Sequence, residues 1–186
     1  MIVIGITGSI ASGKSSVAKL IAKKKYPLFN ADNVVTNLYN NSSFTNLLIK
    51  KFKLSNEKSV KNQIKLLIKK NKRILKILES VIHPLVRKEM KNFLKIKRKI
   101  LVLEIPLLIE SKLDKYFDKI IFVEAKKNLR LKRYLKHKNK KEIFETLNNR
   151  QLSSFIKKKS CHLTINNDHS LSILKKNVNK LMKNYE

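Results

Sequence analysis

The sequence predicts a three-layer α/β fold, in which a parallel sheet of five strands lies between helices. Two observations support this prediction. Short, almost wholly apolar runs, typical of strands buried on both faces, alternate with longer segments whose apolar residues recur every three or four positions. The first apolar run also leads directly into a glycine-rich loop and then a helical pattern, which is the order that a parallel sheet needs between neighbouring strands.

The glycine-rich loop spans residues 8–15, GSIASGKS, and fits the phosphate-binding pattern G-x-x-x-x-G-K-[ST] at every position. Its two glycines allow a bend in which successive N–H groups point at a phosphate, and the N-terminus of the following helix adds positive potential. We expect Lys14 to reach the β- and γ-phosphates of a nucleoside triphosphate and the Ser15 hydroxyl to bind Mg²⁺. A glycine-rich turn that binds nothing is disfavoured because a strand and a helix both flank the loop. The expected ATP-binding residues are Gly8, Ala11, Ser12, Gly13, Lys14, Ser15 and Ser16.

Length and composition favour one folded domain. The chain has 186 residues, and 42% of them are hydrophobic, enough for a buried core. It has no apolar run long enough for a membrane span and begins with a predicted strand, so we expect no membrane association and no signal peptide. A single cysteine, Cys161, excludes an internal disulfide and favours a cytoplasmic location, and it has no paired ligands at zinc spacing. We expect a monomer or a small homo-oligomer.

The net charge of +30, from 43 Lys and Arg against 13 Asp and Glu, makes nucleic-acid binding an alternative function. The basic residues are nearly all lysines, are spread over every predicted helix, and are not interleaved with aromatic residues as a base-stacking surface would need. Lys, Asn and Ile are also the residues of A/T-rich codons, so a genomic bias accounts for the charge. We therefore expect solvated lysine faces, no specific nucleic-acid partner, and weak binding to polyanions at low salt.

After the loop, the sequence predicts a helix from Lys14 to about Lys25 and a short strand, Leu28–Asp32, with a polar end. Ligands of an open parallel sheet lie beyond the carboxyl ends of its strands, so we expect Asp32 near the triphosphate. A carboxylate there can accept the proton of a substrate hydroxyl as that hydroxyl attacks the γ-phosphoryl group. From the spacing alone, an aspartate that caps the next helix is an equally good interpretation.

Residues 33–97 show apolar stripes at helical spacing and no clear strand, which predicts an inserted helical lobe able to cover a substrate. Near its end, Pro84 is well placed to start a new helix, which would put Arg87 on the first turn. His83 and Arg87 are therefore candidates to face one anionic ligand. The alternatives are a buried histidine and a surface arginine.

Three further strands are predicted at residues 100–103, 118–123 and 163–166, followed by a last helix at 170–183. Glu104 ends the first of these strands, where an acidic residue can bind Mg²⁺ or its waters. Residues 128–137 and 140–160 predict two helices around a turn, which resembles the lid that excludes water from the transfer in small-molecule kinases. A lid arginine can neutralise charge on the transferring phosphoryl group, although a solvated helix face is the alternative; the lid arginines are Arg130, Arg133 and Arg150.

Three stretches outside the loop add a family resemblance: FNAD at 29–32, LESVIHPLVR at 78–87 and LEIPLLIE at 103–110. They are similar to the D-A-D, L-E-x-I-I-H-P-L-V-R and D-x-P-L-L-F-E motifs of the dephospho-CoA kinases, and the resemblance extends from the first strand to about Ser170. Four further polar residues fall on positions of that family: Arg133 on a lid arginine, Gln151 and Lys157 on later polar positions, and Asn167 on an asparagine beyond the fifth strand.

The resemblance implies that ATP with Mg²⁺ phosphorylates the 3′-hydroxyl of the ribose of dephospho-CoA, giving coenzyme A and ADP in the last step of coenzyme A biosynthesis. It implies a P-loop, nucleotide-kinase-like fold in one domain, with a core at 1–32, 98–127 and 160–186, an acceptor-binding insertion at 33–97 and a lid at 128–159. The implied site residues are Asp32 as catalytic base, Lys14 and Arg133 as further catalytic residues, His83 and Arg87 for the acceptor, and Ser15 and Glu104 for the metal.

Five residues depart from the family pattern: Asn30 replaces Asp, Thr36 replaces Arg or His, His137 replaces a lid arginine, His162 replaces Asp and His169 replaces Gly. Two other functions therefore stay open. A different small-molecule kinase of the same fold would be separated by comparing acceptors. A P-loop protein that has lost catalysis and binds nucleic acid is disfavoured, because Lys14, Ser15 and Asp32 are all present and the lysines are dispersed.

Overall fold

The computed structural model describes residues 1–23, 25–136 and 140–185, and it divides into two compact units. The first unit, Met1–Asn30 with Ile96–Glu186, contains the sheet and the phosphate-binding loop. The second unit, Ala31–Lys95, consists of helices and their connections. None of the helices in the described ranges is both long and apolar enough to cross a membrane.

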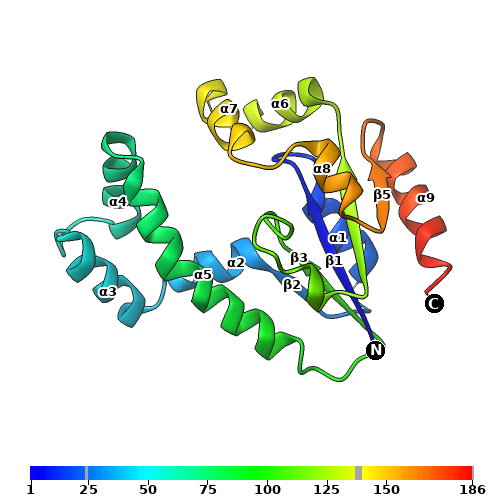
Figure 1. Cartoon of the computed structure of the whole chain (residues 1–186), viewed down its shortest axis with the longest axis horizontal. Helices are drawn as coiled ribbons and strands as arrows, with labels where there is room; N and C mark the ends of the chain where they lie inside the picture. Colours follow the sequence, from blue (N-terminus) through cyan, green and yellow to red (C-terminus); the bar gives the residue numbers. More distant parts are fainter. Residues whose placement is uncertain (24, 137–139, 186) are drawn as a thin grey trace. The chain divides into compact units, whose positions relative to one another are not determined.

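The first unit is built on a five-stranded parallel sheet in the order β2-β3-β1-β4-β5, which confirms the predicted fold class. Figure 1 shows β1 in the middle of this unit, between β3 and β4. The register places Ile6 beside Glu104 and Gly8 beside Val123, so the strand ends that flank the loop lie at one edge of the sheet. The strands are β1 (Ile2–Gly8), β2 (Leu28–Asn30), β3 (Ile100–Glu104), β4 (Lys119–Glu124) and β5 (Leu163–Asn166).

The core of the first unit follows from alternation along the strands. Helices α1 (Lys14–Ala22) and α9 (Leu171–Met182) pack together over Ile4 and Ile6. Apolar side chains of the two helices, of β1 and of the neighbouring strands form one buried cluster. On β1, Gly5 is a close approach, because a Cβ atom there would lie 2.8 Å from the side chains of both Leu108 and Phe117. The segment after β3, which includes the short 3₁₀ turn η1 (Asp114–Tyr116), therefore packs directly against the backbone of β1.

In the part of the chain that the structure describes, the predicted lid contains three helices rather than two: α6 (Lys127–Leu135), α7 (Lys141–Asn149) and α8 (Ser154–Lys159). The prediction of one helix over 140–160 is wrong, because the chain leaves the helical path after Asn149. Gln151 and Leu152 bond to distant segments instead, and Ser153 caps α8 by accepting a hydrogen bond from Ile156 N. The predicted turn at 137–139, with His137, lies outside the described residues.

The second unit contains α2 (Ala31–Leu38), α3 (Ser42–Phe52), α4 (Val60–Lys70) and α5 (Arg73–Phe93). The predicted apolar stripes meet in a core of their own, made by Phe44, Leu48, Ile64, Leu78 and Ile82. The predicted helix start at Pro84 is wrong, because this proline lies inside α5, a continuous helix of 21 residues. Proline removes one backbone donor from a helix. Here the buried residues Leu78, Ile82 and Met90 on both sides of it keep the helix packed.

Two boundaries near the loop also differ from the prediction. Helix α1 ends at Ala22 rather than near Lys25, because Lys23 adopts a left-handed conformation with φ of 43°. Strand β2 ends at Asn30, so Asp32 does not extend the strand but lies in the first turn of α2.

Candidate active site

The second half of the phosphate-binding loop has a conformation that depends on glycine. Gly13 has φ of 95°, and a Cβ atom there would lie only 2.1 Å from Nδ2 of Asn167. That nitrogen donates a buried hydrogen bond of 2.8 Å to the carbonyl oxygen of Ser12. Asn167, which follows β5, therefore braces the loop at the point where α1 begins, a role that the sequence did not assign to it.

Next to this turn, the predicted metal-binding residues lie together. The Ser15 hydroxyl donates a hydrogen bond of 2.6 Å to Oε1 of Glu104, and Asn30 Nδ2 donates one of 2.5 Å to Oε2. Glu104 is 2% exposed, whereas Ser15 is an exposed residue, so a buried carboxylate holds the hydroxyl of a residue at the surface. The described residues contain no cluster of three or more His, Cys, Asp or Glu that could hold a metal by themselves. A hydroxyl and one carboxylate, completed by phosphate and water, is the oxygen donor set that suits Mg²⁺.

Lys14 and Arg133 each donate a hydrogen bond to a backbone carbonyl oxygen, Lys14 within the loop and Arg133 at the asparagine that braces it. The ammonium group of Lys14 donates a hydrogen bond of 3.0 Å to the carbonyl oxygen of Ser9, so the lysine folds back over the loop. Arg133, on α6, donates from Nη2 to the carbonyl oxygen of Asn167 at 2.7 Å. Its other terminal nitrogen, Nη1, is buried and has no hydrogen-bond partner among the described residues.

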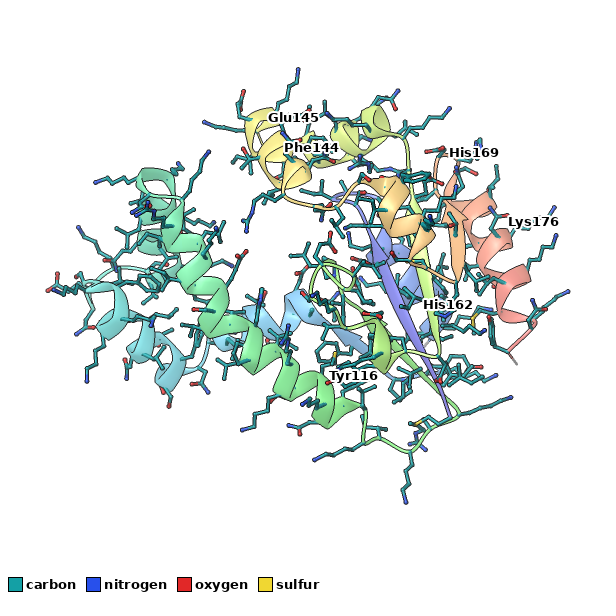
Figure 2. The ribbon with its side chains drawn as sticks, in the orientation of Figure 1. Tyr116, Phe144, Glu145, His162, His169 and Lys176 are labelled. Carbon is teal, nitrogen blue, oxygen red and sulfur yellow. The ribbon has the colours of Figure 1, made fainter. Side chains whose placement is uncertain are left out.

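The tip of the loop is bonded to two residues of the predicted lid that the sequence analysis did not place there. Gln151 Oε1 accepts a hydrogen bond of 2.9 Å from the N–H of Ile10, and Arg130 Nη1 donates one of 3.3 Å to the carbonyl oxygen of the same residue. Arg130 is buried, and its guanidinium lies 5.7 Å from the ring of Phe144, which Figure 2 shows on α7. Burial lowers the pKa of Arg130, although the carboxylate of Glu145 opposes this. Arg130 is therefore a buried, hydrogen-bonded residue of α6, and the alternative of a solvated helix face is wrong for it.

In the helical unit, the predicted acceptor residues lie on one exposed face of α5. His83 and Arg87 are both exposed and are spaced one helical turn apart, so the buried alternative for His83 is wrong. A groove of about 360 Å³ runs along the second half of this helix, and most of its lining is cationic. The lining residues are Pro84, Arg87, Lys88, Lys91, Asn92 and Lys95. Asp32 is exposed on α2, where Thr36, the residue that departs from the family pattern, donates its hydroxyl to the Asp32 carbonyl oxygen at 3.0 Å.

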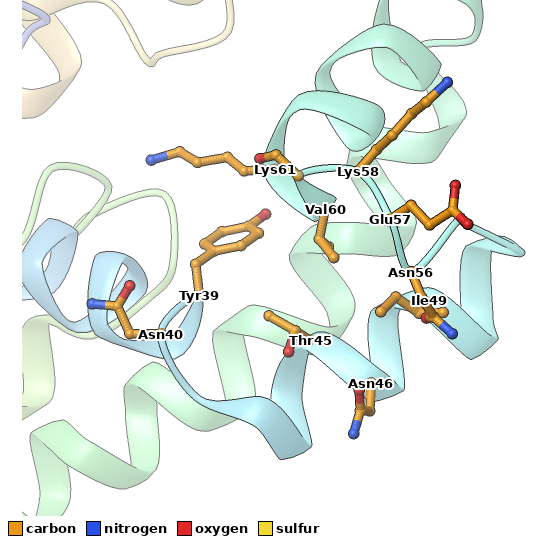
Figure 3. Close-up of a pocket in the computed structure, with 11 residues that line it drawn as sticks. Tyr39, Asn40, Thr45, Asn46, Ile49, Asn56, Glu57, Lys58, Val60 and Lys61 are labelled. Atoms are coloured by element: carbon orange, nitrogen blue, oxygen red, sulfur yellow. The ribbon is translucent and has the colours of Figure 1, made fainter.

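A second cavity of the helical unit, about 720 Å³, opens between the turn after α2, helix α3 and the chain that leads into α4. Figure 3 shows Tyr39, Thr45 and Val60 around its centre. The ammonium group of Lys61 lies 5.7 Å from the centre of the Tyr39 ring, and burial raises the pKa of the Tyr39 hydroxyl. This cavity is polar and open.

The remaining departures have structural partners. His162 Nδ1 accepts a hydrogen bond of 3.0 Å from the N–H of Ile120, so it occupies an acceptor position that an aspartate would also fill. His169 is exposed after Asp168, whose carboxylate accepts bonds from Lys126 N and Asn166 Nδ2. Burial raises the pKa of the Cys161 thiol to about 11, which makes this cysteine a poor nucleophile and a poor metal ligand.

The geometry can be compared with known proteins. The family model for dephospho-CoA kinase matches residues 2–172. The chain belongs to the dephospho-CoA kinase family. This confirms the family that the sequence motifs resembled, and with it the predicted activity, a kinase that phosphorylates dephospho-CoA to coenzyme A in the last step of coenzyme A biosynthesis.

Individual relatives cover the chain closely. The dephospho-CoA kinase of Fusobacterium nucleatum is 32% identical over 188 residues, which span 97% of this chain and 96% of that protein. The dephospho-CoA kinase of Bartonella henselae is 38% identical over 161 residues, 82% of each chain.

Solved structures share the fold. A Thermus thermophilus protein superposes with a TM-score of 0.82 at 26% identity, covering 100% of this chain and 98% of its own. The dephospho-CoA kinase from Campylobacter jejuni gives a TM-score of 0.68 at 22% identity, with 99% and 97% covered. The shikimate kinase from Acinetobacter baumannii gives a TM-score of 0.57 at 12% identity, covering 99% of this chain and 94% of its own. The last two likenesses concern the fold alone.

Proposed function

We propose that this kinase transfers the γ-phosphoryl group of ATP, with Mg²⁺, to the 3′-hydroxyl of the ribose of dephospho-CoA. The observation that supports this most directly is the group formed by the Ser15 hydroxyl, the buried Glu104 carboxylate and Lys14 at one end of the phosphate-binding loop. A metal bound by Ser15, and by Glu104 directly or through water, would neutralise charge on the β- and γ-phosphates. Lys14 would bind the same phosphates once it leaves the Ser9 carbonyl oxygen.

Asp32 is the proposed general base. It follows Asn30 by two residues, and Asn30 contacts Glu104, so covalent geometry limits the Cα–Cα distance between Asp32 and Asn30 to about 7 Å. An exposed carboxylate on the first turn of α2 is able to accept the proton of an incoming hydroxyl. Arg133 is proposed to stabilise charge on the transferring group, because its Nη1 is buried without a partner in the part of the chain that the structure describes.

The helical unit is proposed to bind the acceptor. Dephospho-CoA carries a pyrophosphate, and the groove along α5 brings Arg87 together with three lysines and no acidic residue among its lining. His83, one turn before Arg87, would extend this surface. The assignment of residues 33–97 as the acceptor-binding insertion and of 128–159 as the lid of one kinase domain remains part of this proposal. So do the cytoplasmic location, the absence of a specific nucleic-acid partner and the monomeric or small oligomeric state.

The test is ADP release by the purified protein with ATP and Mg²⁺, with and without dephospho-CoA, and with product identification by mass. We expect ADP release that depends on dephospho-CoA, with one molecule of coenzyme A formed for each ADP. A nucleoside, a nucleotide and a small hydroxy acid serve as competing acceptors. Faster turnover with any of these than with dephospho-CoA, or ATP binding without acceptor-dependent turnover, would contradict the proposal.

A further inference from the structure

At the tip of the phosphate-binding loop, the backbone N–H and the carbonyl oxygen of Ile10 both form hydrogen bonds with residues of the predicted lid. The N–H of Ile10 donates to Gln151 Oε1 at 2.9 Å, and its carbonyl oxygen accepts from Arg130 Nη1 at 3.3 Å. The hydroxyls of Ser9 and Ser154 lie 3.3 Å apart beside them. Ala11, which follows Ile10, has φ of 57°, a left-handed conformation that residues with a side chain rarely adopt. This part of the loop therefore depends on contacts from outside the motif.

Gln151 is in turn fixed by a buried ion pair. The N–H of the next residue, Leu152, donates to Glu110 Oε1 at 3.1 Å, and the same oxygen lies 2.6 Å from the ammonium nitrogen of Lys157. The Lys157 side chain is 0% exposed and that of Glu110 is 16% exposed. A lysine is rarely buried to this extent unless it is paired. The pair explains why the chain leaves its helical path after Asn149 and why Gln151 points at the loop.

We propose that Gln151 is a positioning residue for ATP, which acts by fixing the Ile10 peptide of the phosphate-binding loop and is itself oriented by the Glu110–Lys157 pair. Gln151 does not need to touch the nucleotide in this role. It presets the backbone conformation in which the amides of the loop face the phosphates, so that less ordering is required when ATP binds. The proposal rests on the proposed function only in assuming that ATP binds this loop.

The first experiment measures ATP affinity directly, by titration of the whole protein without acceptor. Gln151→Met removes the acceptor oxygen at nearly constant side-chain length, and a cavity of about 340 Å³ beside Gln151 leaves room for the methionine. The loss of one hydrogen bond should weaken ATP binding by about threefold to tenfold. The matched control is Asn149→Met, at an exposed residue that lines the same cavity, which should bind ATP within about twofold of wild type.

Kinetics then separate positioning from general destabilisation. With Gln151→Met, the KM for ATP should rise by the same factor while kcat and the KM for dephospho-CoA stay within about twofold, because binding of ATP and of the transition state weaken equally. A structural defect would lower kcat through loss of active protein and would leave the KM for ATP unchanged.

The ion pair is tested by non-additivity. The double variant Glu110→Gln/Lys157→Met removes both charges, so that no lone charge stays buried. In the wild-type background it should weaken ATP binding. In the Gln151→Met background it should weaken ATP binding by less than about a further twofold, since both changes act through the Ile10 peptide. If Gln151→Met binds ATP as wild type does, or if Asn149→Met loses as much affinity, the proposal is wrong. Failure of the wild-type protein to bind ATP would instead overturn the proposed function.

Discussion

The two ends of the phosphate-binding loop are surrounded by different kinds of neighbours. At the end that leads into α1, Ser15 meets Glu104 and, through it, Asn30, which are the last residues of adjacent strands. At the tip, Ile10 meets Arg130 and Gln151, which lie 120 and 141 positions further along the chain. The first set follows from the motif and from the parallel register of the sheet. The second set exists only because α6 and the chain before α8 pack onto the loop.

This difference separates chemistry from positioning. The groups at the Ser15 end are the oxygen and nitrogen atoms that would bind Mg²⁺ and phosphate, so changes there should reduce catalysis without affecting the fold. The groups at the tip bond to each other and to the backbone, and part of their network is an ion pair in the protein interior. Changes there should reduce stability or ATP affinity while the chemistry is retained.

The largest expected effect on stability is at the tip side. Lys157→Met leaves the Glu110 carboxylate partly buried without its cation, so the free energy of unfolding should fall by about 3–5 kcal/mol. Urea denaturation measures this change. The control is the next residue, Lys158→Met, whose ion pair with Glu124 is exposed and should contribute about 0–1 kcal/mol. If both substitutions lowered the free energy of unfolding equally, the buried Glu110–Lys157 pair would contribute no more to stability than the exposed Glu124–Lys158 pair, which would contradict the prediction.

At the other end of the loop, Lys14→Ala should have the opposite pattern. It removes a cation that we propose to stabilise charge in the transition state, so kcat/KM should fall by about 10²–10³-fold. Without nucleotide, the lysine donates to the Ser9 carbonyl oxygen within the same loop, so thermal unfolding without nucleotide should change by no more than about 2 °C. Lys19→Ala, on the exposed side of the same helix, is the control and should change neither quantity. A large loss of thermal stability in Lys14→Ala would mean that the loop, not the chemistry, depends on this lysine.

A smaller effect is expected for Glu104→Gln. The substitution keeps the size of the side chain and an oxygen that can accept a hydrogen bond from Ser15, but it removes the negative charge that we propose to face the metal. The Mg²⁺ concentration for half-maximal activity should rise by about 10–100-fold. Glu124→Gln, at the end of β4, removes a strand-end carboxylate outside the Ser15 group and should leave the Mg²⁺ requirement unchanged. An unchanged requirement in Glu104→Gln would exclude a role for this carboxylate in metal binding.

The smallest effect concerns the turn after β5, which carries Asn167 to the loop. Burial alone would raise the pKa of Asp168, but hydrogen bonds from the Lys126 N–H and the Asn166 amide, with the charges of Lys126 and His169, lower it below 3.8. A carboxyl whose pKa is lowered by folding stabilises the protein above its ordinary pKa, and this contribution is lost as the pH falls through the lowered value. Asp168→Asn should therefore be slightly less stable than wild type at pH 7, and in thermal unfolding the difference should shrink as the pH falls below 3.8. A difference that stays constant from pH 7 to pH 3 would show that charge is not its origin.

The sequence predicted the strands and the Ser15 end of the loop because both depend on short-range patterns. Apolar runs marked three of the five strands, β3, β4 and β5, to within one residue at each end, and the motif named Ser15 and Lys14 directly. The sequence predicted only that Glu104 and Ser15 lie near each other at the ends of the strands. The parallel register brings them close enough for a hydrogen bond.

The tip of the loop was not predictable in the same way. Gln151, Lys157 and Asn167 were recognised as family positions without a role, because their partners lie more than 40 residues away and nothing local marks them. Lys157 also contradicts the expectation that the lysines are solvated faces. Pro84 was misjudged for a related reason: its local preference favours a helix start, and packing of residues on both sides outweighs that preference.

The central claim is that Asp32 accepts the proton of the dephospho-CoA hydroxyl as the phosphoryl group is transferred, and the most direct test is the turnover of Asp32→Asn measured beside its ATP affinity. We predict that kcat for coenzyme A formation falls by about 10²–10⁴-fold while ATP binds with wild-type affinity, since asparagine keeps the shape of the side chain and cannot act as the base. Wild-type turnover in Asp32→Asn would contradict the assignment of the base and leave only the nucleotide-binding half of the site.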